Sequence, residues 1–185
     1  MISEFRKFRG WVVLEHFLKN PYAQIHIKRL ARELKIGNYS AQHYLAVLGK
    51  TGILNSKQTG NMKLYSLNNE NFSVPALKEF YFLQRLNEMD FPKTFISENP
   101  SIITLVLYGS YADGTYAEKS DIDILAIATK EKIKQESLNK LELEFGKEVS
   151  ISIYTFGEWR KLVRRRDNFA LSVQKNNVAL YGAGI

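Results

Sequence analysis

The chain has 185 residues, of which 45% are hydrophobic and 24% are charged, so it is long enough for one large domain or two small ones with buried cores. It contains no cysteine, which excludes disulfides and thiolate metal sites. Residues 1–6 lack an apolar signal region, and no apolar run approaches the roughly 18 residues of a membrane-spanning helix. We therefore expect a cytoplasmic protein with no membrane partner.

The positive charge is concentrated in one part of the chain. Residues 1–69 hold 11 of the 26 Lys and Arg but three of the 19 Asp and Glu, which gives this part a net charge of +8. Because the whole chain carries +7, residues 70–185 carry −1. This asymmetry indicates two domains and points to a polyanion as the partner of the first one.

The spacing of apolar residues predicts three helices and then a two-stranded basic turn in the N-terminal part. Ser40 is the expected N-cap of the third helix, and Gly52 ends that helix. The predicted helices are 10–18, 25–34 and 40–50, and the predicted strands are 53–54 and 64–67.

This order of elements, with Leu30-Ala-Arg-Glu-Leu34 and Gly52-Ile-Leu54, resembles the winged helix-turn-helix of prokaryotic regulators. The resemblance implies that the third helix enters the major groove of double-stranded DNA, while the basic turn contacts its backbone. It also implies a homodimer on paired half-sites. An ordinary solvated helix face is the alternative for the basic residues. The residues placed near base edges are Ser40, Gln42 and His43, and those placed near phosphates are Lys50, Lys57 and Lys63.

A connecting segment, residues 70–100, separates the expected domains 1–69 and 101–185. Within it, residues 74–89 have the spacing of an amphipathic helix. Strands and helices follow one another through the second domain. The predicted strands are 102–108, 124–128, 147–154 and 178–182, and the predicted helices are 130–145 and one that begins in a capping box at 155–158.

The most informative stretch is residues 105–125, where an apolar strand stops at Gly109-Ser110 and a Ser-Asp-Ile-Asp-Ile-Leu run follows. Strand side chains alternate between faces, so Asp121 and Asp123 point to one side while Ile122 points into the core. Two carboxylates about 7 Å apart along a strand are costly without a cation between them. Oxygen ligands suit Mg²⁺ or Mn²⁺, and the amides of the Gly-Ser turn are placed to hold phosphates.

An apolar strand, Gly-Ser, ten intervening residues and Asp-apolar-Asp together resemble the signature of the DNA polymerase β-type nucleotidyltransferases, especially the minimal ones. The resemblance implies an α+β chain whose second domain is a nucleotidyltransferase-like mixed β-sheet with flanking helices. It also implies Mg²⁺-dependent or Mn²⁺-dependent transfer of a nucleotidyl group from a nucleoside triphosphate to a hydroxyl. By position, Asp121 and Asp123 bind metal, and the nucleotide-binding residues are Gly109, Ser110, Lys119 and Ser120.

Two positions depart from the family pattern. Active relatives usually add a third carboxylate from the strand equivalent to 147–154, where this chain has Ser150. A neutral Ser does not bridge metals or act as a base as a carboxylate does, so Glu148, on the same face, is the candidate third catalytic residue beside Asp121 and Asp123. Asp113 stands where relatives often have Arg, which replaces an attractor of phosphate by a repeller.

These departures leave three hypotheses. In the first, which we favour, the chain is a DNA-binding nucleotidyltransferase that modifies a hydroxyl of a protein, an RNA or a small molecule. In the second, it is a transcriptional regulator or antitoxin-like protein, whose second domain binds a nucleotide or a protein partner without efficient catalysis. In the third, it is a two-domain regulator whose second domain binds no nucleotide.

Overall fold

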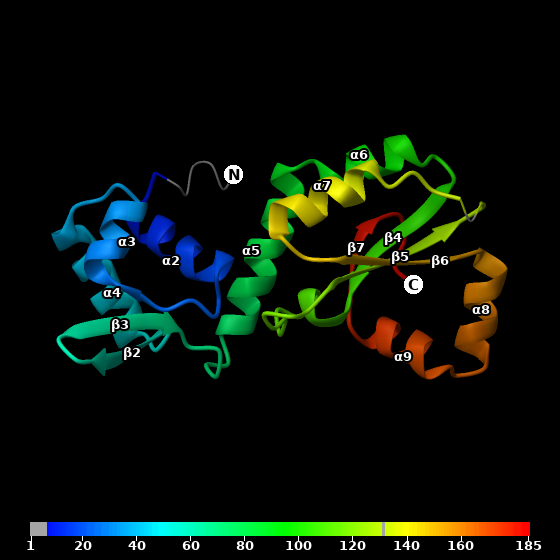
Figure 1. The fold of residues 1–185 in the computed structure, drawn as a ribbon. Coiled ribbons are helices and arrows are strands. Elements are labelled where there is room, and N and C mark those ends of the chain that lie inside the picture. The colour runs from blue at the N-terminus through cyan, green and yellow to red at the C-terminus, as the bar shows by residue number, and fades with distance from the viewer. Residues whose placement is uncertain (1–6, 131) are drawn as a thin grey trace. The chain divides into compact units, whose positions relative to one another are not determined.

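A computed structural model describes residues 7–130 and 132–185 and divides the chain into two compact units, Met1–Tyr81 and Phe82–Ile185 (Figure 1). Both units combine helices with a sheet, as the sequence predicts. No helix in the described part of the chain is long and apolar enough to cross a membrane.

Within residues 7–73, the first unit contains three helices and a three-stranded antiparallel sheet with strand order β1-β3-β2. Its core is formed by apolar residues that recur at helical spacing, such as Leu14, Phe17 and Leu18, together with the inner side chains of the sheet. The helices are α2 (Arg9–Lys19), α3 (Ile27–Glu33) and α4 (Asn38–Lys50), and the strands are β1 (Ile25–His26), β2 (Leu54–Thr59) and β3 (Met62–Leu67).

The start of the second helix differs from the prediction. Ile25 and His26 form strand β1, in which they pair with Tyr65 and Leu64 of β3. The imidazole Nδ1 of His26 then accepts a hydrogen bond from the Arg29 amide at 3.3 Å and so caps α3. A strand of two residues is too short to show a periodic pattern in the sequence. The strand that it pairs with lies far along the chain, so the local sequence does not reveal the pairing either.

Helix α5 (Val74–Glu88) contributes to both cores. Val74 and Tyr81 pack with the first unit, whereas Phe82 and Leu86 belong to the core of the second. The division between the compact units falls at 81/82, within the predicted connecting segment 70–100. The predicted domain borders at 69/70 and 100/101 remain predictions.

The second unit is built on a four-stranded mixed sheet with strand order β6-β5-β4-β7, in which β4 is antiparallel to β5 and β7, and β5 is parallel to β6. Helices α6 and α7 cover one face, and α8 and α9 cover the other (Figure 1). The strands are β4 (Ile102–Tyr108), β5 (Ile122–Ala128), β6 (Val149–Tyr154) and β7 (Asn177–Tyr181), and the helices are α6 (Phe91–Glu98), α7 (Glu136–Phe145), α8 (Phe156–Arg164) and α9 (Asn168–Lys175).

Both faces of strand β5 are buried from Ile124 onward. Ile122 and Ile124 face α6 and α7, as predicted, but Leu125 and Ile127 pack on the opposite face against Trp159 of α8. The polar face that carries Asp123 is therefore short. The predicted helix 130–145 begins later, at Glu136, whereas the predicted capping box is present between Thr155 and Glu158.

Candidate active site

The sheet register brings three polar side chains side by side on neighbouring strands. Asp123 of β5 stands opposite Tyr108 of β4 on one side and opposite Ser150 of β6 on the other. Residues that pair across strands share a face of the sheet, so these three side chains lie together where the buried face ends. Ser150, which is predicted from the sequence to match the third carboxylate of the family pattern, therefore lies beside Asp123.

The turn after β4 lies directly against the Asp123 carboxylate. Gly109 has a φ of +71°, and a Cβ atom added to it would lie 2.5 Å from Asp123 Oδ2. Glycine is needed here twice, because other residues rarely adopt this φ and because no side chain fits between the turn and the carboxylate. Ser110, half-buried, follows in the short 3₁₀ turn Gly109–Tyr111.

The two carboxylates of the motif have different environments. Asp121 is exposed just before β5, whereas Asp123 is half-buried within it. Burial, and secondly the negative charge of Asp121, raise the pKa of the Asp123 carboxyl above its ordinary value. Within residues 7–130 and 132–185 neither group has an ion-pair partner, so a bound cation would relieve the repulsion between them.

Glu148 lies just before β6, and its backbone carbonyl accepts a hydrogen bond from the Ile122 amide at 2.9 Å. This bond brings the backbone of Glu148 alongside β5 at the level of the motif. Its side chain is exposed, and the described residues contain no cluster of three acidic or histidine side chains that could hold a metal. A catalytic role for Glu148 thus stays a prediction, with two carboxylates defining the site.

The connection between the two motifs is held by its own polar groups. Ser120 Oγ accepts a hydrogen bond from the Ala117 amide at 2.8 Å and so closes the turn before Asp121. Lys119, the second predicted nucleotide ligand in this turn, is exposed. The rings of Tyr111 and Tyr116 stack with centroids 4.1 Å apart, which fixes the other end of the connection.

Asp113 has a structural role that the sequence did not reveal. Its carboxylate accepts hydrogen bonds from the Thr115 amide at 3.0 Å and from Asn176 Nδ2 at 2.8 Å. The same Asn176 amide group donates to the Gly109 carbonyl at 3.2 Å. Asn176 therefore connects the turn at Gly109 to the end of α9. No local motif marks Asn176, since its partners are distant in sequence.

Tyr108 is a further site residue that sequence reasoning missed. Burial is the main cause that raises the pKa of its phenol, and the Asp123 charge raises it too, while a hydrogen bond with Ser152 lowers it. Its ring packs edge-on against Phe169 of α9. Tyr108 therefore lies beside Asp123, while its side chain is hydrogen-bonded with Ser152.

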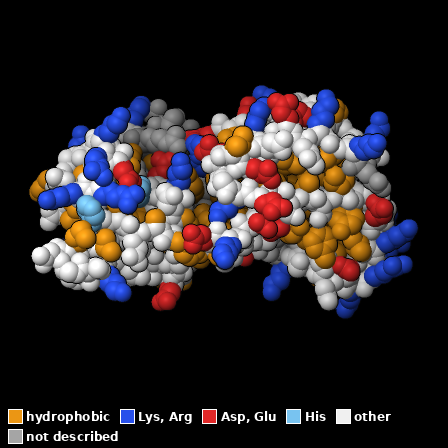
Figure 2. Space-filling view, in the orientation of Figure 1, with side chains coloured by type: hydrophobic (Ala, Val, Ile, Leu, Met, Phe, Trp, Pro, Cys, Tyr) orange, Lys and Arg blue, Asp and Glu red, His pale blue; other side chains and the backbone are white. Residues whose placement is uncertain are grey.

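The residues predicted to contact DNA lie on α4 and on the β2–β3 hairpin. Gln42 and His43 are exposed on α4, as are Lys50 at its end and Lys57 and Lys63 on the hairpin. Figure 2 shows Lys and Arg side chains gathered over the first unit near α3 and α4.

Ser40 does not cap α4, which corrects the prediction. The helix begins at Asn38 with Gly37 as its N-cap, and Ser40 Oγ instead accepts a hydrogen bond from Arg9 Nη1 at 3.3 Å. The ring of Tyr39, beside it, is 84% exposed on the first turn of the helix. The predicted set missed this aromatic side chain.

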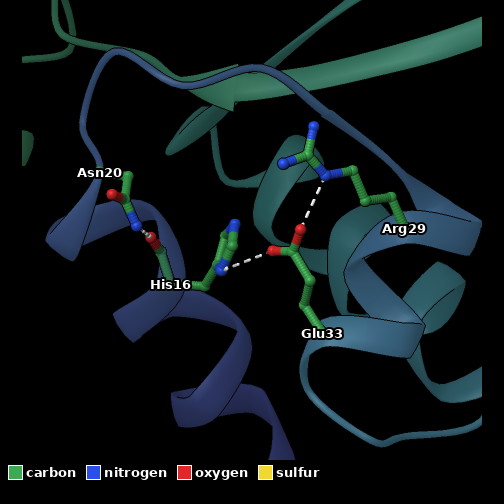
Figure 3. A network of polar contacts seen from close by, with 4 residues as sticks. All are labelled: His16, Asn20, Arg29 and Glu33. Carbon is green, nitrogen blue, oxygen red and sulfur yellow. Dashed lines mark hydrogen bonds and ion pairs between the residues drawn. The ribbon is translucent and has the colours of Figure 1, made fainter.

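One group of charged residues in the first unit forms polar contacts between helices α2 and α3 (Figure 3). Glu33 Oε1 accepts a hydrogen bond from Arg29 Nε at 2.7 Å, and Glu33 Oε2 lies 3.9 Å from Nδ1 of His16 on α2. The Arg29 hydrogen bond is the main cause that lowers the pKa of Glu33, and burial lowers the pKa of His16. This network joins α2 to α3, so Arg29 is already partnered within the unit.

Residues 93–180 match the family model described as Polymerase beta, Nucleotidyltransferase. The match supports a polymerase β-like nucleotidyltransferase domain in this part of the chain, as the Gly-Ser and Asp-Ile-Asp motifs predict. No curated protein sequence matches the chain.

Several solved structures are similar to parts of the chain. A toxin–antitoxin with AMP-PNP is 22% identical, with a TM-score of 0.37, over 51% of this chain and 73% of that one. A mutant of the toxin–antitoxin MntA–HpeT is 23% identical, with a TM-score of 0.39, over 53% and 75%. A protein from Sulfolobus solfataricus, titled a nucleotidyltransferase, is 19% identical, with a TM-score of 0.34, over 58% and 87%.

Gly109→Ala is expected to destabilise the second unit by about 1 kcal/mol more than Gly146→Ala, in urea unfolding followed by circular dichroism. Both glycines have a positive φ, but a Cβ meets nothing within 4 Å at Gly146, whereas at Gly109 it meets the Asp123 carboxylate. Gly146→Ala is thus the matched control for backbone strain. Removing the carboxylate with Asp123→Ala should cancel the excess, and equal losses in the two single variants would contradict the close approach.

Asp123→Asn is expected to stabilise the metal-free protein at pH 7.5 by roughly 0.5–1 kcal/mol. The pKa of Asp123 is raised, so the folded state holds this proton more tightly than the unfolded chain and the ionised group costs stability above its folded-state pKa. This cost is lost as the pH falls through the unfolded-state pKa, so the variant and the wild type should converge near pH 3.

Urea unfolding across this pH range checks the prediction, and Glu148→Gln removes the same charge from an exposed position as a control. A variant that is less stable than the wild type at pH 7.5 without metal would contradict the assigned environment of Asp123.

Proposed function

We propose that the second unit binds a nucleoside triphosphate together with Mg²⁺ or Mn²⁺ and transfers a nucleotidyl group to a hydroxyl acceptor. The observation that carries the proposal is the close approach between the Gly109 turn and the Asp123 carboxylate. It puts backbone amides that suit phosphates beside a carboxylate that suits a metal. The family match at residues 93–180 supports the same activity class.

The side chains present fit a divalent cation. Asp121 and Asp123 offer oxygen ligands on one side of β5, and they repel each other in the absence of a positive charge. When bound, the metal would offset negative charge on the attacking and leaving oxygens. Asp121 and Asp123 would hold it, while Ser110 and the amides after Gly109 would hold the outer phosphates.

The rate of nucleotidyl transfer depends on a base that takes the proton of the acceptor hydroxyl. The acceptor oxygen forms a bond to the α-phosphorus, the bond from that phosphorus to the bridging oxygen breaks, and pyrophosphate leaves with the electron pair. The acceptor proton needs a base, and Ser150, which pairs with Asp123 across the sheet, does not supply one as a carboxylate would. Glu148 is the remaining candidate base, so we expect tight nucleotide binding and slow transfer.

A titration with ATP, GTP, CTP and UTP in the presence of Mg²⁺, followed by calorimetry, tests the proposal. We expect at least one triphosphate to bind to the wild type, because the turn and the carboxylates contribute together. Binding should fall by more than about tenfold in Asp121→Ala/Asp123→Ala, which corresponds to the loss of roughly 1.4 kcal/mol or more.

Glu148→Gln serves as the matched control in this titration, because it removes a nearby charge that lies outside the two-carboxylate site. It should bind nucleotide like the wild type but lower the rate at which labelled nucleotide is transferred. A wild-type protein that binds no triphosphate would refute the enzyme hypothesis and leave a DNA-binding scaffold.

A second candidate function concerns the first unit, which we propose to be a winged helix that binds double-stranded DNA. Its helices and strands follow one another in the order α2, β1, α3, α4, β2, β3, and the strands of its hairpin carry Lys57 and Lys63. The exposed side chains of Gln42 and His43 on α4 suit base edges, and Lys50, Lys57 and Lys63 suit phosphates. The aromatic ring of Tyr39 adds contact area beside them. A homodimer would place two copies of this surface on paired half-sites.

A DNA-binding first unit is also compatible with a function that needs no catalysis. If the second unit binds nucleotide without transferring it, the protein is a regulator or an antitoxin-like protein, whose DNA or protein partner responds to the bound nucleotide. The difference from the enzyme hypothesis lies in the transfer assay, because both hypotheses need the same nucleotide site.

Lys57→Ala/Lys63→Ala is expected to weaken DNA binding at low salt and to reduce the salt slope of log K by about 0.9 for each lysine. Fluorescence anisotropy with a duplex selected from a random pool, at several salt concentrations, measures both effects. Lys132→Ala/Lys134→Ala removes two exposed lysines from the second unit and should leave the slope unchanged. Equal slopes for the two double variants would show that the hairpin does not contact phosphate.

A further inference from the structure

The second unit has a cavity of about 360 Å³ at the end of the sheet away from the Asp-Ile-Asp motif. Its apolar walls come from the start of β4, the end of β5 and the inner side of α8, through Ile103, Ile127, Trp159 and Val163. Small-molecule sites in proteins commonly measure about 300–1,000 Å³ and are mostly apolar. The cavity is therefore large enough for a ligand with an apolar body.

The rim of this cavity exposes apolar side chains to solvent. Ile103 is 49% exposed and Phe156 is 59% exposed, and both line the cavity. In Figure 2, hydrophobic side chains gather beside α8, and charged side chains of both signs border them. Exposed apolar surface around a hollow is typical of a binding site.

Two arginines provide the charge at this cavity. Arg160 and Arg164 are one helical turn apart on α8, so they lie on the same side of it, and both line the cavity. The Arg160 guanidinium lies over the Phe156 ring at 5.5 Å from its centroid, which joins the cation to the apolar rim.

Neither arginine is neutralised from within the described residues. The nearby acids are engaged elsewhere, because Glu158 accepts from the Thr155 amide at 2.8 Å and Asp167 accepts from the Phe169 amide at 2.9 Å. No Asp or Glu side chain lines the cavity, whose wall also includes residues 183–185, and the ion pairs of the described chain leave Arg160 and Arg164 out. Two guanidinium groups above an apolar floor suit an anionic head group on an apolar body.

The cavity is distinct from the nucleotide site. In the register of β4 and β5, Thr104 stands opposite Ile127 at the cavity, whereas Tyr108 stands opposite Asp123 at the candidate active site. The four steps from Asp123 to Ile127 span about 13 Å of strand. A ligand in the cavity and a nucleotide on the Gly109 turn would therefore contact different residues.

We propose that this cavity is a second ligand site, which takes a small organic anion with an apolar body, such as a medium-chain carboxylate or phosphate ester. The apolar walls hold the body, and Arg160 and Arg164 hold the head group. This site requires neither nucleotide transfer nor DNA binding.

A fluorescence titration of the full chain with anilinonaphthalene sulfonate, an aromatic anion, tests the proposal. We expect saturable binding that decanoate or decyl phosphate displaces and that decanol does not, with the stronger competitor showing which head group the site prefers. Arg160→Gln/Arg164→Gln should weaken binding by about tenfold or more, because it removes charge-assisted hydrogen bonds of roughly 1.4 kcal/mol or more in total. Ile103→Glu should weaken it too, since it puts a carboxylate on the rim.

Arg165→Gln/Arg166→Gln is the matched control, because it removes the same charge from neighbouring exposed positions that do not line the cavity. It should bind the dye like the wild type, with circular dichroism confirming that each variant is folded. Equal weakening in both double variants would overturn the proposal in favour of unspecific attraction. Displacement by decanol as strong as by decanoate would overturn it in favour of a purely apolar docking surface, and the absence of saturable binding would overturn it outright.

Discussion

The Asp123 carboxylate lies against the backbone of the Gly109 turn, at a distance that leaves no room for a side chain between them. This contact depends on the register of β4 and β5, because Tyr108, the residue before Gly109, stands opposite Asp123, and Ser150 of β6 stands on the other side of Asp123. Asn176 stabilises the turn through a hydrogen bond to the Gly109 carbonyl, and packing on both faces of the sheet keeps the strands in place. The candidate active site is thus a consequence of sheet register, and a slip of one residue in β5 would turn the Asp123 carboxylate to the other face of the sheet.

The candidate site could be predicted to the extent that it is encoded locally. Gly109-Ser110 and the alternation of Asp and Ile in residues 121–124 carry a strand, a turn and a polar face within one short stretch. The polar groups that complete the site are a different matter, because Asn176 and Tyr108 act through partners that only the fold brings near. The same reason explains why strand β1 was missed: its two residues are strand only because Tyr65 and Leu64 lie beside them.

Charge could be predicted for each part of the chain but not for each side chain. Residues 1–69 are strongly basic in composition, yet Arg29 is partnered by Glu33, and Arg9 donates to Ser40. In the second unit, which is nearly neutral overall, acidic groups gather at one end of the sheet and arginines at the other. Net charge gives a sum over a region, and the fold decides which charges remain available to a ligand.

Helix α5 links the stability of the two units through the chain itself. Its first half belongs to one core and its second half to the other, although the division between the compact units falls at 81/82. Isolated helices shorter than about 12–15 residues are marginal in water, so neither half is long enough to persist alone. When one core melts, its half of α5 loses support and frays toward the half that the other core uses. Cutting the chain between residues 81 and 82 would therefore divide α5, and we expect each unit to be less stable without the other half of this helix.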